Sequence, residues 1–137
     1  MIRTCAVLVF ILASFGCGTS DDASQHPAEV GKVRSGNLDV VLRAREAALS
    51  TGKDTATIEF RAAADGSLVD VGTVTANAAM PMAGMAPMVG PVEVQPTSTP
   101  GRYLATSDLS MAGQWRLTVE WNGPAGRGSA SFSPTAQ

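Results

Sequence analysis

The methionines are the side chains in this sequence best suited to metal chemistry. Four of the six methionines fall between residues 80 and 88, in a segment that also contains two prolines and a glycine. Proline and glycine at this density interrupt helices and sheet ladders, so we expect the thioethers to project from a loop. A thioether sulfur is a soft, neutral ligand that prefers Cu(I) over hard ions. The segment therefore predicts a soft-metal site, with Met80, Met82, Met85 and Met88 as candidate ligands.

A second short segment carries a fifth candidate ligand, Met111. It begins a Met-Ala-Gly triplet that repeats the triplet beginning at Met82. If both segments lie at one end of the fold, three or four sulfurs can converge on one ion, which thioethers alone would bind weakly and exchange. The alternative is that the methionines, which are flexible, fill gaps in the core or form an apolar surface that faces a partner protein.

Few other side chains are suited to catalysis. The chain has one His, two Cys and one Tyr. With no thiol or imidazole expected in the folded part, Ser-His and Cys-His nucleophiles are excluded. A carboxylate pair such as Asp65 and Asp70 is more typical of solvated turns than of an acid-base site. We therefore expect a protein that is not an enzyme and that has no cofactor other than Cu(I).

The charge balance argues against polyanion binding. The chain has 10 Lys and Arg against 12 Asp and Glu, which gives a formal net charge of -2. Such a balance produces no field strong enough to hold nucleic acid. We expect Arg43, Arg45 and Arg61 to form a weakly basic edge that pairs with Glu46 and Glu59.

The first 16 residues predict a lipoprotein signal peptide. Arg3 precedes an unbroken apolar run over residues 6–13, which is too short for a membrane span of roughly 20 residues. The Gly-Cys pair that follows resembles the lipoprotein processing site, at which Cys17 is acylated and becomes the first mature residue. We expect Cys5 to be lost with the signal. The mature protein would then be lipid-anchored in a bacterial cell envelope, facing the periplasm or the exterior.

Residues 17–36 predict a flexible tether that starts with the lipidated cysteine. The segment is rich in Ser, Asp, Gln, Pro and Gly and has few large apolar side chains, so it cannot bury enough surface to order itself. His26 lies in this segment, and we expect it to be solvated because one imidazole does not make a metal site.

Residues 37–134 predict one all-β domain. Apolar and polar residues alternate with a period of two, most regularly over residues 114–121, where Trp115 and Trp121 are expected as core anchors. About seven short strands, each with one apolar face, predict an immunoglobulin-like antiparallel β-sandwich. The expected strands lie at residues 38–43, 55–61, 68–75, 92–95, 102–106, 114–121 and 128–132, with a bulge expected at Gly72.

Several motifs resemble the YtkA-like domain, which is related to FixH-type domains. The most specific are Met-Pro-x-x-x-Met at residues 80–85 and the stretch from Pro-Gly-x-Tyr at 100–103 to Met-x-Gly-x-Trp at 111–115. The resemblance covers about residues 37–133. It implies an immunoglobulin-like sandwich outside the cytoplasmic membrane, associated with copper handling and with partners in copper efflux or oxidase assembly. Family members often have a His near the methionine loop; this chain has none there, so the resemblance implies a Cu(I) site.

Overall fold

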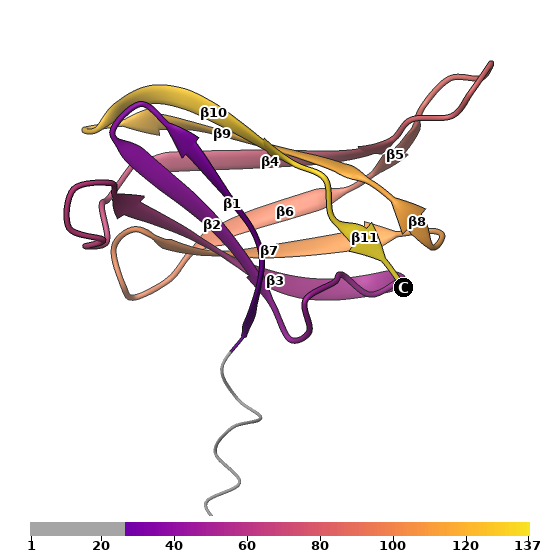
Figure 1. Ribbon diagram of the computed structural model, residues 1–137, viewed down its shortest axis with the longest axis horizontal. Helices are drawn as coiled ribbons and strands as arrows, with labels where there is room; N and C mark the ends of the chain where they lie inside the picture. Colours follow the sequence, from indigo (N-terminus) through magenta and orange to yellow (C-terminus); the bar gives the residue numbers. More distant parts are fainter. Residues whose placement is uncertain (1–26) are drawn as a thin grey trace, which may run out of the picture.

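The computed structural model describes residues 27–137, which form strands, turns and no helix (Figure 1). One sheet has five antiparallel strands in the order β1-β2-β3-β7-β6. These strands are β1 (Ala28–Ser35), β2 (Leu38–Ala44), β3 (Gly52–Ala62), β7 (Arg102–Leu109) and β6 (Val92–Pro96). We call it the first sheet.

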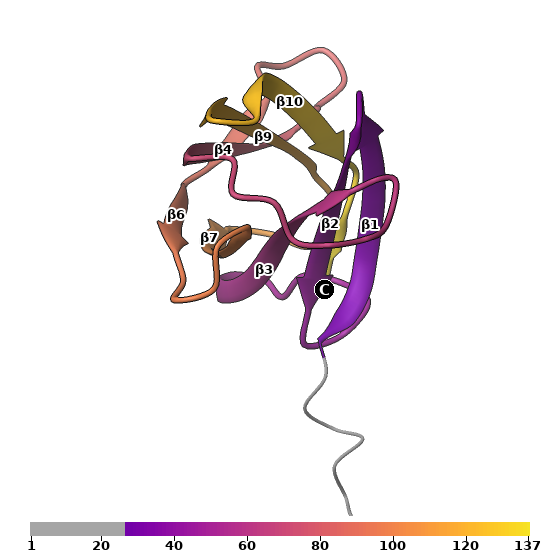
Figure 2. The ribbon, with the colours of Figure 1, turned by 90° about the vertical axis from the view of Figure 1, so that its left-hand side faces the viewer.

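The second sheet has four antiparallel strands in the order β10-β9-β4-β5. They are β10 (Gly126–Phe132), β9 (Arg116–Gly123), β4 (Thr73–Met80) and β5 (Met88–Gly90). A two-residue ladder joins β8 (Gly113–Gln114) to β11 (Thr135–Ala136). Viewed from the end of the domain in Figure 2, the two sheets form two layers. No helix long and apolar enough to cross a membrane occurs in residues 27–137.

The strand order is that of an immunoglobulin-like sandwich. Strands β2-β3-β7-β6 correspond to the four-stranded sheet of that fold, and β10-β9-β4 to its three-stranded sheet. The predicted fold class is therefore confirmed. The expected number of about seven strands is too low, because β1, β5, β8 and β11 are also present. The last three have two or three residues each, too few to show a period in the sequence.

The core lies between the sheets and is built by the alternation seen in the sequence. On β9, Leu117, Val119 and Trp121 are buried while the residues between them face outward. Trp121 packs edge-on against Phe60 of the first sheet, with ring centroids 5.1 Å apart. Trp115, just before β9, is also buried. Both tryptophans are thus core residues, as predicted.

The predicted tether is wrong for residues 28–36. This segment forms β1 and the turn to β2, and β1 pairs with β2 over its whole length. Val30 and Val33 pack against the core, and the register shifts at Val30, so both can face inward although they are three residues apart. Two apolar residues and a ladder thus order a segment whose overall composition is polar. The signal peptide, Cys17, the tether residues 17–26 and His26 lie outside the described residues.

The expected strand at residues 68–75 is also wrong in its bounds. Residues 69–72 form no strand, and β4 starts at Thr73 and continues to Met80. Gly72 has a φ of 78° and lies so close to β9 that a Cβ there would be 2.8 Å from the carbonyl oxygen of Asn122. It lies in the irregular segment before β4, at a close approach of two backbones, rather than in a bulge.

The close approach of two backbones can be tested at the turn before β7. Gly101 has a φ of 84°, and a Cβ there would be 2.6 Å from the carbonyl oxygen of Val69. Gly36 also has positive φ, 60°, but nothing lies within 4 Å of its Cβ position. Gly36→Ala should therefore cost only backbone strain, about 1 to 2 kcal/mol. Gly101→Ala should cost about 1 to 3 kcal/mol more, because the Val69 backbone cannot yield freely.

Urea unfolding of the two variants and the parent chain measures this difference. Equal losses of unfolding free energy in the two variants would contradict the close approach at Val69.

Candidate functional site

Two of the methionines lie in a β-hairpin rather than in a loop. Met80 is the last residue of β4 and Met88 is the first residue of β5, and the two are direct cross-strand partners. The expectation that all four side chains project from a loop is therefore wrong at these two positions. The prolines and the glycine fall between the two strands, at residues 81–87, where they interrupt no ladder.

The cross-strand pairing puts both side chains on the same face of the second sheet. Directly opposed residues on antiparallel strands point the same way and have Cβ atoms about 4.5 to 5.5 Å apart. On β4 the inward residues include Val74 and Ala78, and Met80 continues this series with 9% exposure. The sulfurs of Met80 and Met88 thus start from neighbouring positions on the inner face, at the end of the sandwich.

The segment between β7 and β8 meets this pair. The hydroxyl of Ser110 donates a hydrogen bond to the sulfur of Met88 over 2.9 Å. The terminal methyl of Met80 packs at Gly113, 2.8 Å from where a Cβ would be. Figure 1 shows β8 and the β4–β5 hairpin at the same end of the domain. The two methionine-bearing segments, 80–88 and 110–113, therefore lie together.

Trp115 holds the second segment in place. Its indole Nε1 donates a hydrogen bond to the carbonyl oxygen of Met111 over 3.1 Å. The same ring lies against Gly90 of β5, where a Cβ would be 3.1 Å from it. One buried side chain thus contacts the hairpin and fixes the backbone of Met111, whose own side chain is 41% exposed.

The tip of the hairpin is separate from its base, by which we mean Met80, Met88 and the segment that carries Met111. Met82 is half-buried and Met85 is 64% exposed, in a turn closed by a hydrogen bond of 3.4 Å from the Met85 N–H to the Met82 carbonyl. The loop extends away from both sheets (Figure 1). The structure therefore brings Met80 and Met88 against the segment that carries Met111, and it leaves Met85 apart from them.

Three residues of this site have no counterpart among the predicted ligands. Ser110, Gly113 and Trp115 contact the methionine segments, yet the sequence indicated only Trp115, and only as a core residue. The Met-Ala-Gly triplet beginning at Met111 was the available signal, because Ser110 directly precedes it and Gly113 is its last residue. Within residues 27–137 no three His, Cys, Asp or Glu side chains are grouped as metal ligands.

Comparison with known protein families identifies the domain. The model of the family described as YtkA-like matches residues 32–120, well over half of the chain. The chain belongs to the YtkA-like family. A search of curated proteins gives no match.

The carboxylates of Asp65 and Asp70, which we expected in solvated turns rather than in an acid-base site, hydrogen-bond to nearby residues of this YtkA-like domain. Asp65 accepts hydrogen bonds from the N–H and the hydroxyl of Ser67, 3.0 and 2.7 Å away, and these bonds lower its pKa. Asp70 accepts a hydrogen bond of 2.9 Å from the N–H of Gly72 and one of 3.4 Å from the hydroxyl of Tyr103. Both carboxylates are engaged in bonds that shape the segment between β3 and β4.

A second cluster of polar groups lies on the outer face of the first sheet of the YtkA-like domain. The side chain of Glu59 is 4% exposed and accepts hydrogen bonds from Arg61 at 2.7 Å, Arg102 at 3.0 Å and Arg43 at 3.3 Å. Burial alone would raise the pKa of Glu59, but the bonds and charges of Arg61 and Arg102 outweigh burial and lower the pKa. The expected pairing of Arg43 and Arg61 with Glu59 is present. Arg102 was not expected.

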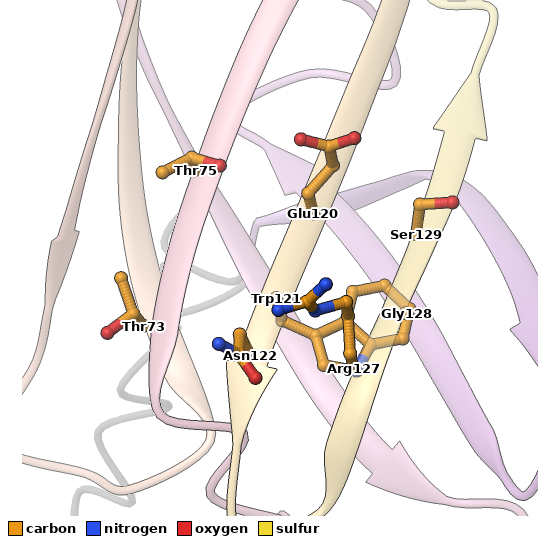
Figure 3. Close-up of a pocket in the computed structure, with 8 residues that line it drawn as sticks. All are labelled: Thr73, Thr75, Glu120, Trp121, Asn122, Arg127, Gly128 and Ser129. Atoms are coloured by element: carbon orange, nitrogen blue, oxygen red, sulfur yellow. The ribbon is translucent and has the colours of Figure 1, made fainter.

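The opposite side of the domain carries an open polar hollow, shown in Figure 3. It lies on the outer face of β4, β9 and β10, where the indole of Trp121 passes beneath Gly128. None of the methionines lines it. The residues around it are Thr73, Thr75, Glu120, Trp121, Asn122, Arg127, Gly128 and Ser129.

Asp39 gives the YtkA-like domain a defined acid sensitivity. A hydrogen bond of 2.9 Å from Arg34, together with the ammonium of Lys32 at 3.0 Å, lowers the pKa of Asp39 from 3.8 to about 2. As pH falls, the unfolded chain takes up this proton first, so the stabilising contribution is complete above about pH 5 and is lost as pH falls towards 2. Asp39→Asn should therefore flatten the decline of stability between these pH values.

Urea unfolding at a series of pH values measures this effect. Glu93→Gln is the matched control, because Glu93 receives a bond from the amide of Gln95 rather than from a cation. The control should keep the decline of the parent chain. An Asp39→Asn protein with the same decline would show that the pair contributes nothing.

Proposed function

We propose that this YtkA-like protein is a lipid-anchored extracytoplasmic protein that binds Cu(I) and hands it to an efflux or oxidase-assembly partner. Met80, Met88 and Met111 form the base of the site, and Met82 and Met85 supply donors from the hairpin tip. The role is non-enzymatic: the domain positions soft ligands, and the carboxylates Asp65 and Asp70 are engaged in turns.

The meeting of the two methionine segments carries the proposal. The contacts of Ser110 with Met88 and of Gly113 with Met80 fix the segments at one end of the sandwich. Thioether ligands suit Cu(I), and they cannot form disulfides in an oxidising compartment. A neutral all-thioether site releases its metal readily, which suits transfer better than storage.

The alternative is a metal-free interaction module, and the exposure of the hairpin favours it. Met85, Val89 and Met111 are large apolar side chains that remain exposed at this end of the domain. Flexible methionine surfaces repack against partners of different shape. In this case the hairpin contacts the partner directly and metal is not involved.

Cu(I) titration in competition with a chromophoric chelator tests the metal site. Changing Met80, Met88 and Met111 together to Leu keeps the apolar volume and removes the sulfurs at the base. This variant should bind Cu(I) at least about 100-fold more weakly than the parent chain, a loss of about 2.7 kcal/mol. Changing Met82 and Met85 to Leu should weaken binding by about tenfold at most.

Cu(I) affinity and partner capture together distinguish the metal site from the interaction module. Parent and base variant with equal Cu(I) affinity would contradict the metal site. If the base variant then lost its capture of an efflux or assembly protein while its Cu(I) affinity stayed equal to that of the parent, the interaction module would be favoured. Far-UV circular dichroism of each variant checks that the strands are retained.

The membrane anchor has an independent test. The intact mass of the mature protein should correspond to a chain that begins at acylated Cys17, and Cys17→Ser should move the protein from the membrane fraction to the soluble fraction. A Cys17→Ser protein that stays on the membrane would contradict the lipid anchor and leave the Cu(I) experiment unaffected.

A further inference from the structure

The outer face of the first sheet carries charged residues in cross-strand rows. Because directly opposed residues share a face, the register of β1, β2, β3 and β7 places them together. The rows are Arg34–Asp39–Arg61, Lys32–Val41–Glu59–Arg102 and Glu29–Arg43–Thr57–Leu104. We call this surface the arginine face.

The arginine face has an excess of positive charge. Its rows contain five Lys or Arg side chains and three carboxylates, whereas the whole chain is formally negative at -2. Two of the three carboxylates, Asp39 and Glu59, are buried beneath the cations that bind them. The guanidinium side chains stay accessible, with Arg43 32% and Arg102 40% exposed. Solvent over these three rows therefore meets mainly cationic groups, whereas the rest of the same sheet face carries Lys53, Glu93 and Asp108.

The polypeptide enters the domain at this same face. Arg43 donates a hydrogen bond of 3.4 Å to the carbonyl oxygen of Pro27, the residue before β1. Pro27 also lines the hollow formed by Arg43, Glu59, Arg61 and Arg102. Pro27 lies ten positions after Cys17, with nine residues between them. A chain of that length spans at most about 36 Å, so an acylated Cys17 keeps this end of the domain near the bilayer.

We propose that the arginine face rests on anionic phospholipid headgroups of the membrane that holds the anchor. Guanidinium groups bind phosphate oxygens through charge-assisted hydrogen bonds, and basic residues at a membrane surface are attracted to anionic lipids. The inference rests on the proposed acylation of Cys17. It orients the domain: the first sheet faces the lipid, and the second sheet faces away from it.

Site-specific quenching in vesicles tests this orientation. The full-length lipidated protein has no other free thiol after processing, so a fluorophore can be placed at Leu104→Cys on the arginine face or at Ser129→Cys on the second sheet. Both positions are exposed. In phosphatidylglycerol-containing vesicles with headgroup-labelled quencher lipids, the probe at 104 should be quenched at least about twofold more than the probe at 129. High salt should remove the difference, because screening weakens contacts between exposed charges.

Charge-matched variants identify the groups involved. Arg43→Gln with Arg102→Gln leaves Arg61 to pair with Glu59 and should abolish the difference between the two probes. Arg116→Gln with Arg127→Gln removes the same charge from exposed positions of β9 and β10 and should leave the difference intact. The salt dependence of the parent protein provides the test if the first variant fails to fold.

Several results would overturn the proposal. Equal quenching of the two probes on acylated protein would exclude this orientation while leaving the anchor and the Cu(I) site standing. A probe response to inorganic phosphate alone, without a response to vesicles, would make the cluster a small-anion site instead. A mature mass without acyl chains on Cys17 would overturn both the anchor and the orientation.

Discussion

The candidate site depends on the packing of Trp115 beneath β5. The ring fits because Gly90 has no side chain, and its N–H is at the same time bonded to the carbonyl oxygen of Met111. A buried indole needs a partner for its single donor, and here that partner belongs to the segment that carries the fifth methionine. Core packing and the placement of two sulfur-bearing segments are therefore set by one side chain.

The fold followed from the sequence because its main signal is local. Period-two alternation of residue types over β2, β3 and β9 marks the inner face of each strand, and this was sufficient for a sandwich. On β2 and β3 the outward residues Asp39, Val41 and Glu59 are buried as well, which the alternation did not show. Alternation did not predict the strands that are ordered mainly by pairing with a neighbouring strand. β1 has few apolar residues and is held by its ladder with β2, and β5 has only three residues. Neither could be distinguished from a loop by composition.

The site was only partly predictable for a related reason. Methionines in both segments were visible in the sequence, and so was the repeated triplet. Which of them share a face depends on the register of the β4–β5 hairpin, which places Met80 opposite Met88. The same holds for Arg102, which reaches Glu59 across a sequence separation of 43 residues because β3 and β7 are neighbours. Alternation indicates which face a residue takes, but it does not indicate which residue of another strand lies opposite it.

The shortness of β5 affects how copies of this domain meet. β5 is the last strand of its sheet, and prolines at positions 87 and 91 bracket its three residues. A long exposed edge is a template on which a neighbouring molecule can add a strand, and proline removes the N–H groups that such addition needs. At this edge of the second sheet, a neighbouring molecule therefore finds few N–H and C=O groups on which to add a strand.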